Sequence, residues 1–432
     1  MIFKNASILT EDMETREHVN VSIEGGVIKS IGDYSPSDDF DEKERVIDSS
    51  NLLLMPGFYN AHGHSPMALM RGYSENMTLQ DWLFNSVFPF EAHLDSEAVY
   101  YGTLLSMAES LKYGIVSTSD MYYFVDDMVK AYSDAKVKGN ISRAVANPTG
   151  QDFSTLVSAA ETVDAVKKYN GINDGKIIID ASIHAEYTSD EQTVIGLSEM
   201  AKDLGVLMHV HLSETKTEHE ECKQRRNGRT PAKYFLDCGI FDIPSLAAHC
   251  VWVEDEDCDI LAEKGVTAVT NPISNLKLAS GICDVKRMMD KGVTMAIGTD
   301  SVASNNNLSF FEEMKMVFML AKYLNNDPRV ITPKEVLRMA TRNGALAQGR
   351  TDCGIIKEGY KADILALDIS GPNLSPVYDM ASNIVLSATD SDIYMTMVDG
   401  EVLYENGEFK TIDIEEAKRG TEEAVKRILS KL

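Results

Sequence analysis

The residues best suited to chemistry in this 432-residue sequence lie at the ends of short apolar runs. Six histidine or aspartate residues share this placement: His62, His64, His209, His211, His249 and Asp300. Side chains repeat every second residue along a strand, so His62 and His64 would face the same side and grip one ion together. Imidazole and carboxylate groups suit Zn²⁺ and also accept Fe²⁺ or Mn²⁺. We therefore predict one divalent metal ion, with zinc as the first choice, held by His62, His64, His211 and Asp300.

A bound divalent ion would supply the nucleophile for hydrolysis, because it lowers the pKa of water from about 16 to roughly 7. Glu214 follows His211 by three residues, in HVHLSET, where it could take the proton of the water and pass it to a ring nitrogen. We expect His249 to hydrogen-bond the water and Asp300 to accept a proton during the attack. An amino group must leave as ammonia, which needs several such transfers. The pattern predicts hydrolytic removal of an amine, with Glu214, His249 and Asp300 as catalytic residues.

The elements that would position these residues form a regular series. Eight apolar runs alternate with longer segments of helical periodicity, as repeated βα units do. Eight such units close a (β/α)8 barrel of the TIM type, in which functional residues gather at the C-terminal ends of the strands. We assign this α/β barrel to residues 56–352.

The two ends of the chain have a different pattern. Short alternating strands and hairpin turns such as VDGE and YENGE recur before and after the predicted barrel. We expect residues 1–55 and 353–432 to pair into one small β-sandwich domain. The final amphipathic helix, in IEEAKRGTEEAVKRILSKL, is expected to close that domain.

Composition narrows the class of partner. The formal charge of −26 disfavours binding to nucleic acid or to an anionic membrane surface, so we expect a small-molecule substrate. Six cysteines without a CxxC pair are read as reduced thiols, which predicts a cytoplasmic protein. The first residues lack the pattern of a secretory signal, and no run of 18 apolar residues occurs.

Several linked motifs together resemble one known family. PGFYNAHGH, HVHLSET, AAHCV, NPISNLKLASG and GTDSVASNNN resemble the 5′-methylthioadenosine/S-adenosylhomocysteine deaminase branch of the amidohydrolase superfamily, over nearly the whole chain. The resemblance implies a mononuclear site with the four ligands given above, proton transfer by Glu214 and His249, and a homo-oligomer. The residues agree on one metal ion, because the fourth apolar run ends in His184 rather than in a lysine that could bridge two.

The same resemblance implies substrate contacts. Glu91 in FPFEAHL corresponds to a glutamate that holds ribose hydroxyls, His184 in ASIHAEY to a histidine near the nucleoside, and Glu214 also faces the substrate. Only one arginine, Arg143, occurs in RAVANPTGQDFSTL, which disfavours a substrate with a free carboxylate tail. Glu186 would instead favour a hydroxyl-bearing or cationic group. The expected substrate is an adenosine-type nucleoside such as 5′-methylthioadenosine, 5′-deoxyadenosine or adenosine, with S-adenosylhomocysteine less favoured.

Two other functions remain open at this point. A deaminase of a free base such as guanine, or a hydrolase of a chlorinated or thiolated heterocycle, would use the same metal ligands, but a free base offers no diol to Glu91. A catalytically silent barrel predicts the loss of an essential residue, whereas all of them are present. His209 is expected to be a structural residue beneath His211. His18, His93 and His219 are expected to be solvated.

Overall fold

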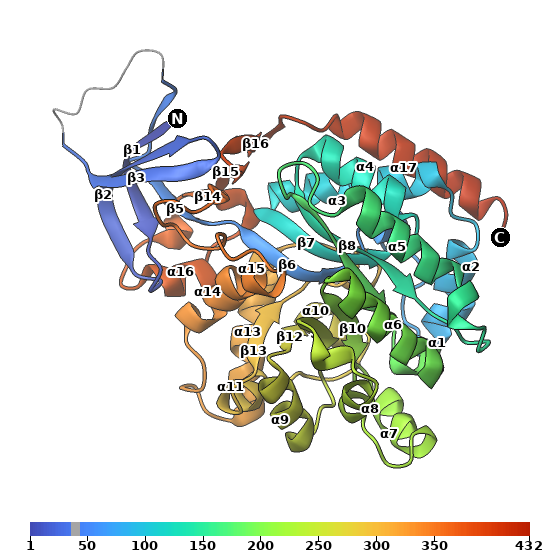
Figure 1. Ribbon diagram of the computed structural model, residues 1–432. Coiled ribbons are helices and arrows are strands. Elements are labelled where there is room, and N and C mark those ends of the chain that lie inside the picture. The colour runs from blue at the N-terminus through green and yellow to red at the C-terminus, as the bar shows by residue number, and fades with distance from the viewer. Residues whose placement is uncertain (36–43) are drawn as a thin grey trace.

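The centre of the protein is a barrel of eight parallel strands, seen in a computed structural model that describes residues 1–35 and 44–432 (Figure 1). The strands follow one another in sequence order: β6 (Phe58–Gly63), β7 (Ile115–Tyr122), β8 (Lys138–Val145), β9 (Ile177–Ile183), β10 (Met208–Leu212), β11 (Ser245–His249), β12 (Thr267–Thr270) and β13 (Thr294–Ile297). The backbone N–H of Asp300 donates to His62 O at 3.0 Å, and a parallel bridge joins Gly63 to Asp300. These contacts bring the last strand back to the first, so the predicted (β/α)8 fold is confirmed.

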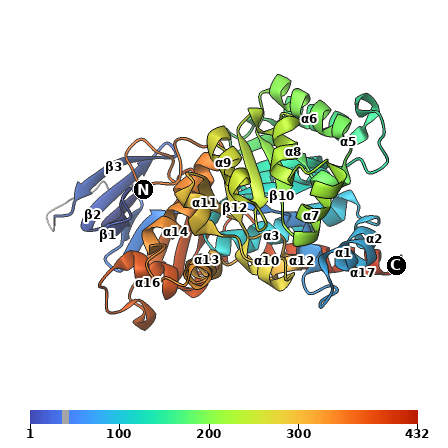
Figure 2. The ribbon, with the colours of Figure 1, turned by 90° about the horizontal axis from the view of Figure 1, so that it is seen from below.

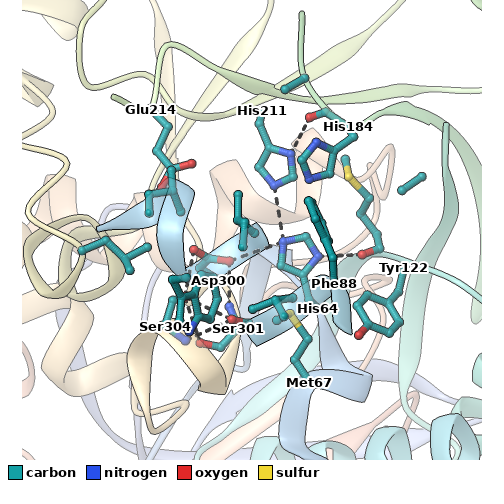
Figure 3. A pocket seen from close by; sticks show the side chains of 18 of the residues that line it. His64, Met67, Phe88, Tyr122, His184, His211, Glu214, Asp300, Ser301 and Ser304 are labelled. Carbon is teal, nitrogen blue, oxygen red and sulfur yellow. Dashed lines mark hydrogen bonds and ion pairs between the residues drawn. The ribbon is translucent and has the colours of Figure 1, made fainter. Parts of the chain in front are cut away.

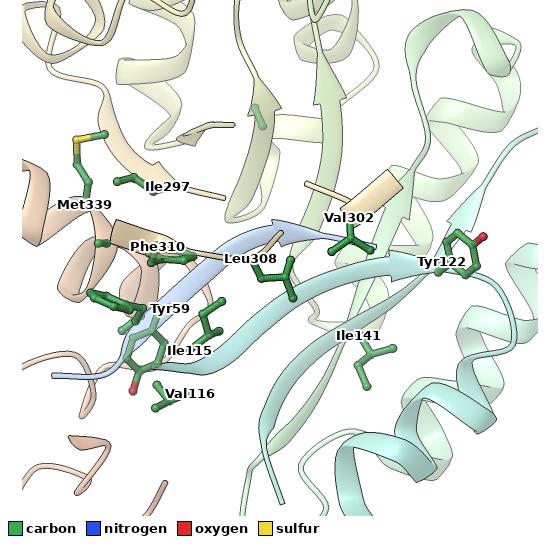
Figure 4. Close-up of a cluster of buried hydrophobic side chains, with 14 of the residues drawn as sticks. Tyr59, Ile115, Val116, Tyr122, Ile141, Ile297, Val302, Leu308, Phe310 and Met339 are labelled. Atoms are coloured by element: carbon green, nitrogen blue, oxygen red, sulfur yellow. The ribbon is translucent and has the colours of Figure 1, made fainter. Parts of the chain in front are cut away.

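The barrel strands are apolar runs because helices cover them outside and side chains fill them inside. In β9 the sequence IIIDASI is buried almost throughout, and β10 and β11 are fully buried. Phe58 of β6 stacks on Phe310 with ring centroids 5.2 Å apart and meets Phe311 edge-on at 5.4 Å. Figure 4 shows side chains of this core, among them Tyr59 of β6, Ile115 of β7 and Phe310, which follows β13 in the chain.

Helices surround the barrel and begin at residues that cap them. Asp95 accepts from Ala98 N–H at the start of α3, and Asp190 accepts from Thr193 N–H at the start of α6. The helices are α1 (Leu79–Trp82), α2 (Phe88–Glu91), α3 (Ser96–Lys112), α4 (Val125–Ala135), α5 (Val157–Tyr169), α6 (Glu191–Leu204), α7 (Lys216–Arg225), α8 (Pro231–Asp237), α9 (Asp255–Lys264), α10 (Pro272–Lys277), α11 (Val285–Asp290), α12 (Val302–Asn305), α13 (Phe310–Asn325), α14 (Pro333–Ala340), α15 (Arg342–Ala347), α16 (Met380–Leu386) and α17 (Ile414–Leu429).

A second sheet combines strands from both ends of the chain and lies beside the barrel (Figures 1 and 2). Its strands are β1 (Ile2–Leu9), β2 (Thr15–Glu24), β3 (Val27–Asp33), β4 (Val46–Asp48), β5 (Leu52–Pro56), β14 (Ile364–Asp368), β15 (Ile393–Val398), β16 (Glu401–Glu405) and β17 (Glu408–Phe409). β5 and β14 pair antiparallel and join the two halves. The edge strand β3 also contacts the segment that precedes β14, because Ile28 N–H donates to Tyr360 O at 2.9 Å. The sheet has its own apolar core, separate from that of the barrel.

The C-terminal helix differs from the expectation. α17 lies along α3 of the barrel rather than closing the terminal sheet, and its end is far from that sheet in Figures 1 and 2. Arg427 donates two hydrogen bonds to the carboxylate of Asp95, and Thr421 donates to Tyr101 O at 3.3 Å. The apolar stripe of α17 therefore covers a barrel helix. Among the residues that the structure describes, there is no helix with the length and apolar character that crossing a membrane requires.

Candidate metal centre and substrate pocket

Five of the predicted site residues meet at the C-terminal mouth of the barrel. His62 and His64 come from β6, His211 from β10 and His249 from β11, and Asp300 follows β13. The ligand atoms of His62, His64 and Asp300 lie within 4.8 Å of one another, as do those of His62, His211 and His249. Figure 3 shows His64, His211 and Asp300 pointing toward one another. The barrel thus brings together residues that are up to 238 positions apart in the chain.

Backbone carbonyls determine which nitrogen of two imidazoles carries the proton. His64 Nδ1 lies 2.6 Å from Met121 O, and His211 Nδ1 lies 2.6 Å from His184 O. A carbonyl only accepts, so each Nδ1 is the donor and each neutral ring keeps its lone pair on Nε2. Those two Nε2 atoms are only 3.3 Å apart. Two lone pairs at this distance repel each other unless a cation or a proton lies between them.

The third imidazole supports the same interpretation. His62 is fully buried, and its Nε2 has no hydrogen-bond partner among the described residues. Asp300 Oδ1 lies 3.7 Å from His62 Nε2 and 3.4 Å from His64 Nε2. Burial, together with the neighbouring imidazoles, lowers the pKa of His62 and of His211 well below the usual value, so both rings are neutral and could bind a metal ion. The Nε2 lone pairs of these imidazoles face one carboxylate oxygen of Asp300, at distances that suit ligands around one divalent metal ion.

His209 supports this cluster from behind. Its Nε2 lies 2.9 Å from His62 Nδ1, and its side chain is buried beneath His211 on the same strand. A hydrogen bond from His62 Nδ1 to His209 leaves the lone pair of His62 on Nε2, where the ion would bind. His209 therefore is a buried structural residue, as expected, and it also orients a ligand.

Serine hydroxyls hold Asp300 in place. Ser274 donates to Asp300 Oδ2 at 2.6 Å and Ser304 donates to the same oxygen at 3.1 Å, while Ser301 N–H donates to Oδ1 at 2.7 Å. The preceding Gly298 leaves room for His62, because a Cβ on Gly298 would lie 2.8 Å from His62 Cβ. This glycine lets the last strand approach the first closely enough to share one ion.

The backbone is strained where the site residues leave their strands. Ser213, His249 and Asp300 have φ values of 49°, 72° and 58°, in the left-handed region that non-glycine residues rarely adopt. Such conformations persist only when the surrounding structure enforces them, and they gather at functional sites. In this barrel they occur at His249 and Asp300, which line the pocket, and at Ser213, which directly precedes Glu214.

Glu214 reaches the same mouth and is held by a second glutamate. Its carboxylate Oε2 lies 3.8 Å from His249 Nε2, and Ser280 lies within 3.4 Å of its Oε1. Glu218 accepts the backbone N–H groups of Ser213 at 3.1 Å and of Glu214 at 2.7 Å. Burial raises the pKa of Glu214 above the usual range. Burial, reinforced by the charge of Glu214, raises the pKa of Glu218 to about 7.

The sequence analysis did not identify Glu218, although a local signal exists. Thr215 and Glu218 form the T-x-x-E pattern of a helix start, and Thr215 accepts from Glu218 N–H at 3.1 Å. In this helix the glutamate bonds the two residues before the cap rather than the cap itself, and one of those residues is Glu214.

His249 has partners on both sides. Its Nδ1 donates to Asn275 Oδ1 at 2.8 Å, which leaves Nε2 facing Glu214. Burial alone would lower the pKa of His249, but the charges of Glu214 and Asp300 outweigh burial and raise it. The distances also permit His249 to bind the ion beside His62 and His211.

A pocket of about 740 Å³, including space open to solvent, lies beside these residues and gives a substrate access to them (Figure 3). One side is apolar, with Trp82, Leu83 and Phe88 in its wall, and His184 faces it from the end of β9. His184 Nδ1 has no hydrogen-bond partner among the described residues. Burial chiefly, with the neighbouring His64 and His249, lowers the pKa of His184 to about 4, so the ring is neutral.

Glu91 lies at the edge of this pocket rather than in solvent. Tyr122 donates to Glu91 Oε1 at 2.7 Å. Burial raises the pKa of Glu91 to about 7, although hydrogen bonds from Tyr122 and Tyr123 oppose the shift. The second oxygen of the Glu91 carboxylate is a polar acceptor in a largely apolar part of the pocket wall.

Two expectations about other side chains were wrong. Glu186 does not reach the substrate pocket, because it is fully buried and pairs with Arg225 and, at 3.5 Å, with Arg226. His219 is buried rather than solvated, with Nδ1 3.1 Å from Ser213 Oγ and Nε2 3.2 Å from Glu254 Oε1. His18 is exposed, as expected.

Comparisons with known proteins show which family and which solved structures this chain is similar to. A model of the amidohydrolase family matches residues 53–403. A 5-methylthioadenosine/S-adenosylhomocysteine deaminase of Thermoanaerobacter pseudethanolicus is 38% identical over 100% of both chains. A 5′-deoxyadenosine deaminase of Methanosarcina acetivorans is 38% identical over 99% of both. The crystal structure of an adenosine deaminase from Xanthomonas campestris with bound zinc has a TM-score of 0.91 and 26% identity, covering 99% of this chain and 98% of that one.

Proposed function

Because the chain belongs to the amidohydrolase family, as a hydrolase of C–N bonds, we propose that it removes the exocyclic amine of an adenosine-type nucleoside. The observation that carries the substrate class is Glu91, a half-buried carboxylate at the edge of the pocket that also contains the candidate metal-binding residues. A carboxylate offers two acceptor oxygens, which suits the two neighbouring hydroxyls of a ribose. The named activities of the relatives support the same class.

His62, His64, His211 and Asp300 would hold the ion, for which we propose zinc because three imidazoles and one carboxylate suit it. A bound ion supplies a hydroxide-like nucleophile near neutral pH. The absence of nucleic-acid and membrane partners and a cytoplasmic location are proposed from charge and composition, and a homo-oligomer is proposed from the resemblance to the family.

The polar side chains around the ion would move the protons. Glu214, whose pKa is raised by burial, takes one proton from the attacking water and delivers it to a ring nitrogen of the purine. Asp300 takes the second proton and returns it to the amine, so that the C–N bond breaks with ammonia as the leaving group. His249 holds the water between Glu214 and Asp300, and His184 contacts the nucleoside from β9.

The test is ammonia release from purified, zinc-loaded protein with adenosine, 5′-methylthioadenosine, 5′-deoxyadenosine, S-adenosylhomocysteine, adenine and guanine. We expect turnover of the nucleosides and little turnover of the bases. Glu214→Gln should nearly abolish turnover with the metal content unchanged. Activity confined to free bases would disprove the ribose role of Glu91, and an active Glu214→Gln enzyme would disprove the proton transfer by Glu214.

A further inference from the structure

A second hollow adjoins the substrate pocket on the far side of Glu91. It is a groove of about 1900 Å³, including space open to solvent, and its walls come from the segment after β7 and from α5. Phe88, Glu91 and Tyr123 line both the pocket and the groove. A ribose held by Glu91 would therefore have the groove beside it, within reach of a group attached to its 5′ carbon.

The groove carries more negative than positive side chains. Its charged residues are the acids Glu91, Asp126, Asp127, Glu161 and Asp164 and the bases Arg143 and Lys168. Both bases are already paired, since Lys168 Nζ lies 3.2 Å from Asp126 and Arg143 Nε lies 2.6 Å from Glu161. The groove therefore presents a surplus of carboxylates and, in the described part of the chain, offers no cation that lacks a carboxylate partner.

Arg143 is the base nearer to the shared wall, and several contacts fix it. Its guanidinium stacks over the ring of Tyr123, with the central carbon 4.8 Å from the ring centroid, and one terminal nitrogen donates to Ala144 O at 2.6 Å. The Arg143 side chain is only 18% exposed, whereas its partner Glu161 is 50% exposed. Glu161 thus approaches from solvent and occupies the donor side that a carboxylate of a ligand would need.

We propose that the Arg143–Glu161 ion pair determines the substrate's 5′ substituent by excluding one that ends in a carboxylate. This inference rests on the proposed deamination of an adenosine-type nucleoside. A ligand carboxylate would have to displace Glu161 and would also face the remaining acids of the groove. A neutral alkylthio group meets neither cost, and a terminal amine gains from the surplus of carboxylates. The preferred substrate class is an adenosine nucleoside with a neutral or cationic 5′ substituent.

Three nucleosides that share purine, ribose and thioether separate these cases. They are 5′-methylthioadenosine with a neutral tail, S-adenosylhomocysteine with an amine and a carboxylate, and the primary amine that remains when that carboxylate is removed. The readout is kcat/KM for ammonia release by the full-length zinc-loaded protein, expressed as a ratio to 5′-methylthioadenosine. In the native protein we expect a higher kcat/KM ratio for the amine than for S-adenosylhomocysteine.

The decisive variant is Glu161→Gln, which removes the charge that pairs with the Arg143 guanidinium and keeps a side chain of the same size in the groove wall. We expect it to raise the ratio for S-adenosylhomocysteine up to about fivefold, as one partly exposed ion pair would. Adding Arg143→Gln should cancel that gain. Glu199→Gln, which removes the same charge from an exposed position of α6, is the matched control and should leave the ratio unchanged.

Each outcome decides the proposal. A rise with Glu161→Gln that disappears in the double variant supports it. An unchanged ratio, an equal rise with Glu199→Gln, or native turnover of S-adenosylhomocysteine above that of the amine overturns it while the deamination itself stands. If the native protein deaminates none of the three, the proposed function fails and this inference fails with it.

Discussion

The substitution Glu218→Gln tests whether the second glutamate positions Glu214. In the structure both oxygens of Glu218 accept backbone N–H groups, those of Ser213 and Glu214. Glutamine keeps the shape of the side chain but replaces one acceptor by an NH₂ group, which then faces a donor. The turn that directs Glu214 into the pocket loses one of its two anchors.

The expected loss can be worked from that one bond. A hydrogen bond to a charged group contributes about 1.5–3 kcal/mol. If the loss appears in the transition state, where Glu214 must be placed correctly, kcat falls by about 10- to 100-fold, since each 1.36 kcal/mol is tenfold. KM should change little, because no contact joins Glu218 to Glu91, the proposed ribose-binding residue, in the described part of the chain.

The assay is steady-state deamination of 5′-methylthioadenosine, with metal content and thermal unfolding measured on the same samples. Glu220→Gln is the matched control, because Glu220 is exposed on the same helix and only approaches Lys223 at 3.9 Å. A folded, metal-loaded Glu218→Gln protein with kcat within about twofold of the native value would refute the positioning argument, as would an equal loss with Glu220→Gln.

Three further predictions follow from other parts of the structure. Burial raises the pKa of Glu91 to about 7, so its carboxylate becomes protonated as pH falls below that value, and KM for nucleosides should rise there. Glu91→Gln should raise KM about tenfold and remove this dependence of KM on pH. A variant with the same pH profile of kcat and KM as the native protein would contradict the ribose role of Glu91. Removing the metal ion with a chelator should abolish activity and lower the unfolding temperature, and added zinc should restore both; a chelated, metal-free protein with full activity would contradict the metal centre. Lys138 is buried between Asp363 and Asp399, whereas Lys136 pairs with Glu401 at the surface. Lys138→Met should lower the free energy of unfolding by about 3–5 kcal/mol in denaturant unfolding, against less than about 1 kcal/mol for Lys136→Met. Equal losses of unfolding free energy in the two variants would show that burial of the ion pair does not matter.

The sequence was sufficient to predict the barrel and the residues at its mouth, because both depend on local patterns. The strands contain apolar residues and are buried along nearly their whole length, and their C-terminal ends lie at one side of the barrel. A polar residue at that end, such as His62, His211 or Asp300, therefore has a predictable position. The order of strands in the structure follows the order of these runs.

Contacts between distant elements were harder to predict. The amphipathic pattern of α17 shows that one face is covered, but the partner depends on α3, about 300 residues earlier. The burial of His219 depends on Ser213 and on Glu254 of the next βα unit. The orienting bond from His62 to His209 likewise joins two strands that the sequence separates by 147 residues.

The two glutamates that bear on substrate choice show why charge cannot be interpreted from its local segment alone. Glu186 stands two residues after His184, which suggested a substrate contact, yet Arg225 and Arg226 from α7 neutralise it and keep it buried. Glu161 lies on α5 with no motif around it, yet it pairs with Arg143, one of the two bases that line the groove beside Glu91. In each case the available charge is set by an oppositely charged side chain on another element. Glu186, which is close to the site in sequence, is therefore kept out of the pocket, while Glu161, which no motif marks, would determine which charge the groove can accept.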